Sequence, residues 1–447
     1  MTPLDDSKAA AIGVVGGGQL ARMLAQAAAE LGVPLHVQTP SASDPAAPLA
    51  AELVLADLSD AAATRRLAED CAAISFENEW LDLEALAPLA AEGIRFIPSL
   101  EALQPLISKR SQRELQQRLQ LPSPRWFPLD LALPLPQPVP AAAAAGPDAV
   151  TAASSDAPLP SGEAGGLGAV PIDPRAPRLP QGFSYPLMAK AARGGYDGKG
   201  TALLQGPEDL EELLERVDPA TWIVEEFVAF EQELSVVACR DRHGRVLCYP
   251  VVQTHQHQQV CDWVLAPAAV PHAVQAYARN VASSLLTALD YVGVLSIEFF
   301  YGPAGLLINE IAPRTHNSGH YTIEAARTSQ FAQQVRIVAD LPIASPDMTV
   351  PGALMVNLLG FEQGNADYGP QRAALAQLPA AHVHWYDKTG SSLGRKLGHV
   401  TLLLKGASHE ARATEAERRL AEVRTIWPLP AAQPDGLEDA RRAPISA

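Results

Sequence analysis

Three features that mark specialised classes of protein are scarce in this sequence. The chain has only 4 cysteines in 447 residues and no Cys-x-x-Cys motif, so neither a disulfide framework nor a paired-cysteine metal site is indicated. No apolar run approaches the roughly 20 residues that cross a membrane, and the N-terminus lacks the basic and apolar regions of a signal peptide. These absences predict a cytoplasmic protein with reduced thiols.

Positive charge is also scarce. The 34 basic residues are outnumbered by 50 acidic ones, which gives a formal net charge of -16. This balance argues against a broad surface for nucleic acid or for an anionic membrane, although local basic pockets remain compatible with it. Hydrophobic residues make up 47% of the chain, which is enough for the two or three domains that this length predicts.

One long stretch lacks the residues that build a hydrophobic core. Residues 131–181 consist largely of Pro, Ala, Gly and Ser, with almost no aromatic residues, and we predict a disordered low-complexity insertion there. The remaining sequence divides into a first domain at 1–106, a second at 107–348 that carries the insertion, and a third at 349–447.

The first domain opens with a β-α-β pattern around a glycine turn, Gly16-Gly17-Gly18-Gln19. The glycines resemble a dinucleotide fingerprint loosely, but Gln38 and Thr39 stand where a ribose-binding acid is expected. What remains is a helix N-terminus suited to an anion such as a substrate phosphate. A later strand ends in Glu77-Asn78-Glu79, at the edge where such sheets bind ligands; a solvated loop is an equal alternative.

A lysine followed by a glycine-dense loop is the strongest local signal in the second domain. Residues 185–189 are predicted to form a buried strand that presents Lys190, and four glycines lie between 194 and 200. Backbone N–H groups of such a loop can approach a phosphate, and the loop is a candidate lid. Its spacing is not that of a Walker A motif. The alternative is a surface turn with a stray lysine.

Two strand-like runs, 292–300 and 305–311, are predicted to form a hairpin. A register symmetric about Ala304 places Glu298 opposite Glu310, with Cβ atoms about 4.5 to 5.5 Å apart. A divalent cation would remove the repulsion between the two carboxylates, and Mg²⁺ bound to nucleotide phosphates is the usual use of such a pair. Alternatively, one carboxyl is protonated or solvated.

Two further clusters have open interpretations. His255 and His257 beside Cys261 and Asp262 suggest a metal, but no second ligand pair follows at the usual spacing. Cations at 385–388 and 394–399 flank a predicted hairpin, where a phosphate site and a solvated basic turn are both compatible with the pattern.

Five motifs together resemble a known family. They are Gly-Gly-Gly-Gln-Leu-Ala-Arg-Met at 16–23, Gly-Gly-Tyr-Asp-Gly-Lys-Gly at 194–200, Asn-Glu-Ile-Ala-Pro-Arg at 309–314, His-Asn-Ser-Gly-His at 316–320 and His-Trp-Tyr-Asp-Lys at 384–388. In this order they resemble the 5-(carboxyamino)imidazole ribonucleotide synthases, the ATP-grasp carboxylases of purine biosynthesis. The resemblance implies an α/β and α+β ATP-grasp fold with an N-terminal doubly wound pre-ATP-grasp domain and a small C-terminal domain.

The resemblance also implies roles for individual residues. For ATP it implies phosphate contacts from Lys109 and Lys190, a covering loop of Gly195, Tyr196, Asp197, Gly198, Lys199, Gly200 and Thr201, adenine contacts from Glu225, Glu226, Phe227 and Val228, and a ribose contact from Glu233. For Mg²⁺ or Mn²⁺ it implies Glu298 and Glu310, with Asn309 beside them. The family's nucleotide-contacting histidine falls on Gln256, which is a departure from the family pattern.

For the reaction itself, the resemblance places Lys190, Arg314, His316 and Asn317 at the reacting centre. The ribonucleotide would contact Gly18, Gln19, Glu77, Ser318, Lys388 and Arg395. The implied chemistry is activation of bicarbonate by ATP to carboxyphosphate, followed by capture of the carboxyl group by 5-aminoimidazole ribonucleotide, in a homodimer. The alternatives are another ATP-grasp ligase, such as a formate-dependent glycinamide ribonucleotide transformylase, or an inactive nucleotide-binding regulator.

Overall fold

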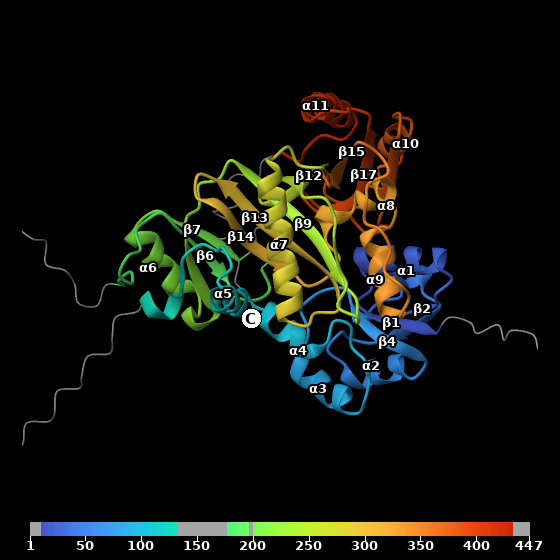
Figure 1. The fold of residues 1–447 in the computed structure, drawn as a ribbon, viewed down its shortest axis with the longest axis horizontal. Coiled ribbons are helices and arrows are strands. Elements are labelled where there is room, and N and C mark those ends of the chain that lie inside the picture. Colours follow the sequence, from blue (N-terminus) through green and yellow to red (C-terminus); the bar gives the residue numbers. More distant parts are fainter. Residues whose placement is uncertain (1–9, 133–176, 196–199, 432–447) are drawn as a thin grey trace, which may run out of the picture.

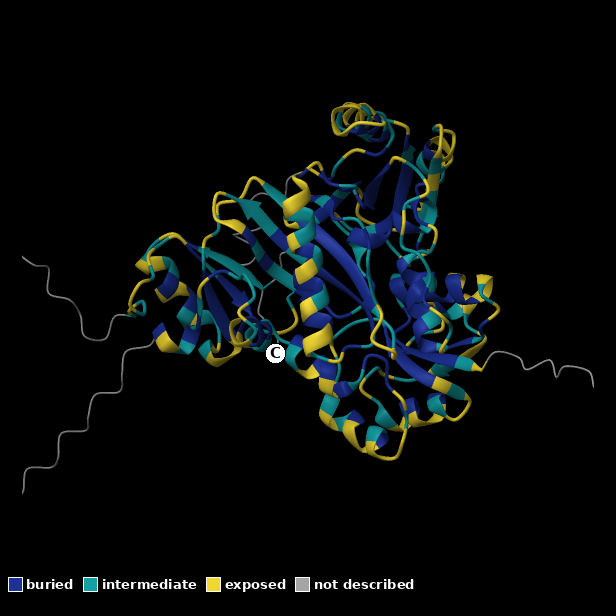
Figure 2. Ribbon diagram, in the orientation of Figure 1, coloured by how far each residue is buried: buried dark blue, intermediate teal, exposed yellow. Residues whose placement is uncertain are grey.

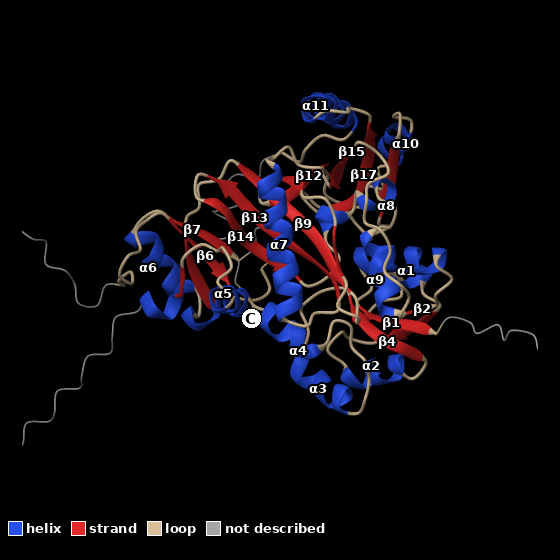
Figure 3. Ribbon diagram, viewed as in Figure 1, coloured by secondary structure: helices blue, strands red, loops and turns tan. Residues whose placement is uncertain are grey.

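The computed structural model describes residues 10–132, 177–195 and 200–431 (Figure 1). Within these ranges the strands form three sheets, two of four strands and one of nine. Helices pack on the sheets, which confirms the mixed α/β and α+β character predicted from the sequence (Figure 3). None of the helices in these ranges combines the length and apolarity needed to pass through a bilayer.

The N-terminal region winds helices around a parallel sheet with the strand order β3-β2-β1-β4. The predicted β-α-β unit is confirmed, and the next two helices begin where Asp60 and Asp82 accept backbone N–H groups as N-caps. The elements are β1 (Ala11–Val15), α1 (Gln19–Glu30), β2 (Leu35–Thr39), η1 (Ala47–Leu49), β3 (Glu52–Leu55), α2 (Ala61–Ala68), β4 (Cys71–Phe76) and α3 (Leu83–Ala91).

A connecting segment leads into a small antiparallel sheet with the order β5-β8-β6-β7. The segment contains α4 (Leu100–Leu103), η2 (Gln104–Leu106) and α5 (Lys109–Arg118). The sheet and its covering helices comprise β5 (Trp126–Pro128), η3 (Leu129–Ala132), β6 (Leu187–Ala191), β7 (Thr201–Leu204), α6 (Pro207–Arg216), η4 (Pro219–Thr221) and β8 (Trp222–Glu226).

The predicted insertion at 131–181 interrupts this small sheet. Its central part, 133–176, lies outside the described residues, so the prediction of disorder stays a prediction. Its flanks are ordered: Ala132 ends η3, and the N–H of Arg178 donates to the carbonyl of Ala132 at 3.0 Å. Leu179 and Phe183 pack on the core of the small sheet. The chain therefore leaves and re-enters the domain at adjoining points.

The large sheet has the order β14-β13-β9-β11-β12-β15-β17-β16, with β10 on the side of β9. Strand β12 pairs with β15, so the sheet continues across the predicted boundary at residue 348 and joins the second and third regions. Its strands are β9 (Gln232–Arg240), β10 (Val246–Cys248), β11 (Val252–His257), β12 (Val260–Ala266), β13 (Gly293–Gly302), β14 (Gly305–Ala312), β15 (Gly352–Leu359), β16 (Ala381–Trp385) and β17 (Lys396–Leu404).

Helices shield the large sheet and join it to the N-terminal region. Figure 2 shows α7 lying across the sheet with its outer side exposed, while the strands beneath it are buried. Helix α9 packs against α1, and this contact links the large sheet to the first domain. The helices are α7 (His272–Ala288), η5 (Asn317–Gly319), α8 (Thr322–Ala325), α9 (Gln330–Val338), α10 (Gly369–Ala376) and α11 (His409–Ile426).

Candidate active site

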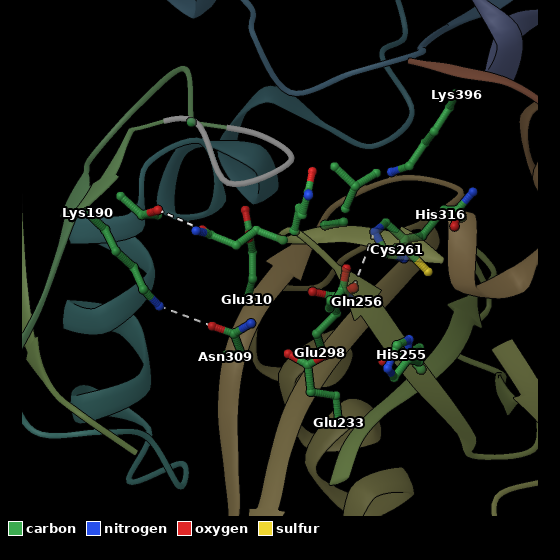
Figure 4. A pocket seen from close by; sticks show the side chains of 18 of the residues that line it. Lys190, Glu233, His255, Gln256, Cys261, Glu298, Asn309, Glu310, His316 and Lys396 are labelled. Atoms are coloured by element: carbon green, nitrogen blue, oxygen red, sulfur yellow. Dashed lines mark hydrogen bonds and ion pairs between the residues drawn. The ribbon is translucent and has the colours of Figure 1, made fainter. Parts of the chain in front are cut away.

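One large cavity brings residues of all three regions together. Its volume is about 1280 Å³, which exceeds the usual range for one small ligand and suits a nucleotide together with a second substrate. Gln19 and Glu77 contribute from the N-terminal region, Lys190 and Glu310 from the central region, and Lys388 from the C-terminal region. Figure 4 shows the central part of this cavity.

Lys190 is the penultimate residue of strand β6 and is held from two sides. Its Nζ lies 2.8 Å from Oε2 of Glu225 and donates to Oδ1 of Asn309 at 3.1 Å (Figure 4). Burial lowers the pKa of Lys190, while the neighbouring Glu225 carboxylate opposes that shift. The predicted phosphate lysine therefore sits on a rigid strand at the cavity wall, as the sequence pattern indicated.

Glu225 was expected to hold adenine through its backbone, and its side chain has a separate role. The carboxylate is buried and also accepts from Nε of Arg113 at 2.7 Å. Although burial opposes it, the charges of Arg113 and Lys190 lower the pKa of Glu225 to about 2. Arg113 was missed by sequence reasoning, because in a charged helix nothing distinguished it from the partly exposed Arg110.

The rest of the predicted adenine segment also lines the cavity. Glu226, Phe227 and Val228 follow Glu225 along its wall. Glu226 forms an ion pair with Arg125 at 2.9 Å, and Phe227 has 46% of its surface exposed. An exposed aromatic ring inside a cavity offers apolar contact to a planar base.

The acidic pair is opposed as predicted: Glu298 on β13 faces Glu310 on β14. The reason given for this register was wrong, because the turn pairs Gly302 with Gly305 and is not centred on Ala304. A bulge between the turn and the pair shifts the register by one residue, so that Glu298 still meets Glu310. The extra residue is Asn309, whose side chain reaches Lys190.

The two carboxyls have opposite electrostatic surroundings. Burial, together with the charges of Glu310 and Glu233, raises the pKa of Glu298 to about 8. Burial acts in the same direction on Glu310, but the ammonium of Lys109, 2.6 Å away, prevails and lowers its pKa. Two facing carboxylates with this mutual repulsion fit a divalent cation, for which hard oxygen ligands are preferred. Within the described residues no cluster of three or more metal-binding side chains exists.

The N-terminus of α1 already holds a protein carboxylate. Glu77 accepts from the backbone N–H of Gly18 at 2.6 Å and from that of Leu20 at 3.1 Å. A side chain at position 18 would lie 2.4 Å from the Glu77 carboxylate, which explains the glycine. Glu77 takes the N–H of Gly18 in this structure, and the contact of Gly18 with the ribonucleotide stays a prediction. Gln19 and Glu77 themselves line the cavity.

Arg314 crosses from the central region to the N-terminal one. Its guanidinium donates two hydrogen bonds to Glu79, at 2.5 Å from Nε and 3.2 Å from Nη2. The sequence analysis placed Glu79 at the sheet edge where ligands bind but predicted no separate role for it. The pair fixes the orientation of Arg314 beside the cavity.

The His316 loop is braced by hydrogen bonds below the cavity floor. Nδ1 of His316 lies 2.9 Å from the hydroxyl of Ser318, and Nε2 lies 3.7 Å from Glu298. Burial, followed by the charge of Arg314, holds the pKa of His316 well below its usual range, so the ring is neutral. Asn317 exchanges two hydrogen bonds with Asn357.

Ser318 was predicted to contact the ribonucleotide, and the structure places it elsewhere. Its hydroxyl is buried between those of Ser235 and Ser296, at 2.7 and 3.3 Å, and it is not among the residues that line the cavity. The hydroxyl is enclosed by three side chains, and the contact with the ribonucleotide stays a prediction. Ser318 orients His316.

Lys388 and Arg395 both line the opposite end of the cavity. Nζ of Lys388 donates to the carbonyl of Lys396 at 2.9 Å, and Nη1 of Arg395 donates to the carbonyls of Thr389 and Gly390 at 2.6 and 2.8 Å. Lys396 also faces this space (Figure 4) and was not predicted as a site residue. The predicted hairpin is confirmed, since β16 and β17 pair antiparallel.

Gln256, the departure from the family pattern, lies beside the predicted ribose-binding acid. Burial raises the pKa of Glu233, and a hydrogen bond from Gln256 opposes this shift. Strands β9 and β11 pair through Thr254 and Glu233, which brings Gln256 within reach. The metal interpretation of the neighbouring histidines gains no support, because His255 stacks on Trp263 with ring centroids 5.1 Å apart.

The glycine-rich loop is described at its two ends. Gly195 and Thr201 line the cavity, and the Thr201 hydroxyl donates to Gln259 at 2.8 Å. Gly200 has φ +73, a conformation that favours glycine. The remaining predicted loop residues, Tyr196, Asp197, Gly198 and Lys199, lie outside the described residues.

The small antiparallel sheet and the large sheet, together with Lys190 and the opposed Glu298 and Glu310, define an ATP-grasp protein. Models of three domain families match the chain in the expected order. They are the ribonucleotide synthetase preATP-grasp domain at 9–106, the ATP-grasp domain at 173–331 and the phosphoribosylaminoimidazole carboxylase C-terminal domain at 353–413.

The chain belongs to the N5-carboxyaminoimidazole ribonucleotide synthase family. It is 46% identical over 419 residues to the synthase of Synechococcus elongatus, covering 94% of this chain and 96% of that one. It is 31% identical over 395 residues to the synthase of Bacillus subtilis, covering 88% and 91%. The identification as an ATP-dependent ligase of purine biosynthesis is thereby confirmed.

Solved structures of this family have the same fold. The synthetase from Thermus thermophilus aligns with a TM-score of 0.74 and 32% identity, covering 95% of this chain and 99% of that one. A synthase from Aspergillus clavatus in complex with ADP and 5-aminoimidazole ribonucleotide aligns with a TM-score of 0.74 and 28% identity, covering 94% and 99%.

Proposed function

We propose that this cavity carries out the ATP- and bicarbonate-dependent carboxylation of the exocyclic amine of 5-aminoimidazole ribonucleotide. The observation that carries the proposal is the meeting of two cationic ends in one cavity, Lys190 and Lys109 at one and Lys388 and Arg395 at the other. One triphosphate and one ribonucleotide phosphate require such a pair of ends. The space between them contains Arg314 and His316, where the reacting groups would meet.

At the nucleotide end, Lys190 and Lys109 would contact the phosphates. The backbone from Glu225 to Val228 would receive adenine, and Glu233 would receive the ribose hydroxyls. Gln256 would take the place of the family histidine by holding Glu233 in position, which the hydrogen bond between the two side chains supports.

Glu298 and Glu310 would hold Mg²⁺, or Mn²⁺, with Asn309 beside them. When bound, the ion supplies positive charge to the phosphates during transfer to bicarbonate. The protein's own contribution is to keep the two carboxylates opposed on adjacent strands and to hold Lys190 on a third. The protein would form no covalent intermediate with the substrates. It would act by positioning them and by stabilising charge in the transition state.

Transfer of the terminal phosphoryl group to bicarbonate would give carboxyphosphate and ADP. The amine of the ribonucleotide would then attack the carboxyl carbon, phosphate would leave, and the amine would lose a proton. Arg314, fixed by Glu79, would stabilise the negative charge on the reacting oxygens. Neutral His316 and Asn317 would serve as hydrogen-bonding groups for the same centre.

An ADP-release assay tests this proposal. The full chain is supplied with Mg²⁺-ATP and bicarbonate, with and without 5-aminoimidazole ribonucleotide, and the carboxylated product is followed separately. We expect ADP release to require bicarbonate and to rise when the ribonucleotide is added. Parallel reactions with formate and glycinamide ribonucleotide serve as the control, and ADP release that follows those substrates would overturn the assignment.

The homodimer implied by the resemblance and the cytoplasmic location predicted from composition stay predictions. Light scattering on the purified chain tests the first, with twice the mass of 47.4 kDa as the expected result. Fractionation of the source cells tests the second.

A further inference from the structure

Arg113 is a buried arginine that stands directly behind the nucleotide end of the cavity. It projects from α5, is 2% exposed, and is not among the residues that line the cavity. Each of its three guanidinium nitrogens donates a hydrogen bond of 2.7 Å: Nε to Glu225, Nη1 to the side chain of Gln116 and Nη2 to the carbonyl of Asn309. Arg113 therefore cannot touch a ligand in this arrangement, and acts on other residues.

Two of its three partners are the same residues that hold Lys190. One oxygen of the Glu225 carboxylate accepts from Arg113 and the other lies 2.8 Å from Lys190. Arg113 binds the backbone of Asn309, and Lys190 binds its side chain. Four elements, α5, β6, β8 and β14, thus converge on one buried cluster.

The charges of this cluster do not cancel. Two cations, Arg113 and Lys190, share the single carboxylate of Glu225, so the cluster carries one surplus positive charge. In a buried setting such a charge interacts strongly with an incoming anion. Without Arg113, Lys190 would be the one cation paired with Glu225, and the cluster would have no net positive charge.

We propose that Arg113 is a positioning residue for ATP: it shares the Glu225 carboxylate and fixes Asn309, so that Lys190 keeps its place and the cluster keeps its surplus positive charge for the triphosphate. The proposal rests on the role of Lys190 given above. It does not depend on the identity of the acceptor, because it concerns nucleotide binding alone.

The test is calorimetric titration of the full chain with Mg²⁺-ATP, without bicarbonate or ribonucleotide. Arg113→Met should weaken ATP binding at least tenfold. Arg113→Lys should bind more tightly than Arg113→Met but less tightly than the wild type, because an ammonium restores the charge and cannot make all three directed bonds. Arg110→Met is the matched control: Arg110 lies on the same helix in an exposed ion pair with Glu114, and its loss should leave affinity unchanged.

A second substitution separates charge from simple structural support. In Arg113→Met/Glu225→Gln the surplus positive charge returns, although one more ion pair has been removed. We expect this double variant to bind ATP more tightly than Arg113→Met. A purely structural role predicts the reverse order, since each lost bond would loosen the site further. If Arg113→Met does not fold, Arg113→Lys keeps the proposal testable, because it retains a cation beside Glu225.

Two results would overturn the proposal: wild-type ATP affinity in folded Arg113→Met, or a double variant that binds no more tightly than Arg113→Met. Thermal denaturation of every variant establishes that it is folded. If Lys190→Met abolishes binding while Arg113→Met does not, the role of Lys190 stands and the role of Arg113 fails. Loss of carboxylation with intact ATP binding would count against the proposed function alone.

Discussion

The two cationic ends of the cavity are built in different ways. At the nucleotide end, Lys190 is buried, and its Nζ contacts the carboxylate of Glu225 and the side-chain amide of Asn309. At the opposite end, Lys388 and Arg395 are partly exposed and donate to backbone carbonyls of their own loop. The first site has its charge fixed by a buried network of ion pairs, whereas the cations of the second site are partly exposed.

This difference predicts how the two ends respond to substitution. A change within a buried ion network alters every partner, because unpaired charges are costly in a low dielectric. A partly exposed cation is screened by solvent, so its removal should disturb its neighbours less. Substitutions at the nucleotide end should therefore have large effects, and those at the ribonucleotide end should be separable from ATP binding.

The largest effect is expected from Lys190→Met. Loss of the ammonium removes the contact with the triphosphate and leaves Glu225 with Arg113 as its remaining cationic partner. ATP affinity should become unmeasurable in calorimetric titration, while thermal denaturation shows a folded protein. Wild-type ATP affinity in this variant would show that Lys190 does not bind the triphosphate. The predicted difference between the two ends would then be wrong.

Lys388→Ala and Arg395→Ala should have the next largest effect, confined to the ribonucleotide. Each removes a charge-assisted contact of about 1.5 to 3 kcal/mol, which corresponds to roughly ten- to a hundredfold in affinity. Because the phosphate is remote from the amine, kcat should fall as well as KM rise. Steady-state kinetics with each substrate varied separately gives the answer. A raised ATP KM with an unchanged ribonucleotide KM would mean that the ends have been exchanged.

The pH dependence of Mg²⁺ binding sharpens the comparison at the acidic pair. Because the pKa of Glu298 is raised to about 8, the ion must displace a proton below that pH. Mg²⁺ affinity measured in the presence of ADP should therefore fall by up to about tenfold for each pH unit below 8. A flat profile between pH 6 and 9 would contradict the assignment.

The same raised pKa has a consequence for stability without ligand. The unfolded carboxyl ionises near its ordinary value of 4.5, whereas the folded one keeps its proton until about 8. The free energy of unfolding should therefore decrease as the pH rises through this window, and Mg²⁺ with ADP should reverse the decrease. Urea denaturation at several pH values, with and without these ligands, measures both.

The smallest effect is expected from removal of the insertion. Because the N–H of Arg178 meets the carbonyl of Ala132, residues 135–176 can be replaced by a short Gly-Ser linker without stretching the flanks. Melting temperature and turnover should remain close to the wild type. The cut stops before Leu179, which packs on the core of the small sheet. Insoluble protein or a large loss of turnover would show that the segment supports the site.

Sequence reasoning was most successful where the signal is local. Apolar strands followed by glycine-rich turns located β1 and β6, and an apolar run that ends before Glu77 located β4. Two β-rich runs located the hairpin that opposes Glu298 and Glu310. These features depend on residues near one another in the chain, whose spacing survives folding. The family resemblance rested on motifs of the same kind.

Sequence reasoning failed where partners are far apart in the chain. Glu77 takes the N–H of Gly18 from 59 residues away, and Glu225 meets Arg113 across 112 residues. No periodicity within α5 separates a buried arginine from an exposed one. Likewise, nothing in the hairpin sequence reveals the bulge at Asn309. The turn is one residue shorter than predicted, and the bulge restores the pairing of Glu298 with Glu310.

The sequence by itself therefore determined the order of the domains, the strands that carry the cavity residues and the chemistry that those residues can perform. The tertiary structure alone decided which carboxylate neutralises which cation. The physical reason is that charge pairing depends on distances of a few ångströms between side chains on different elements, and these distances exist only once the three sheets have packed around the cavity.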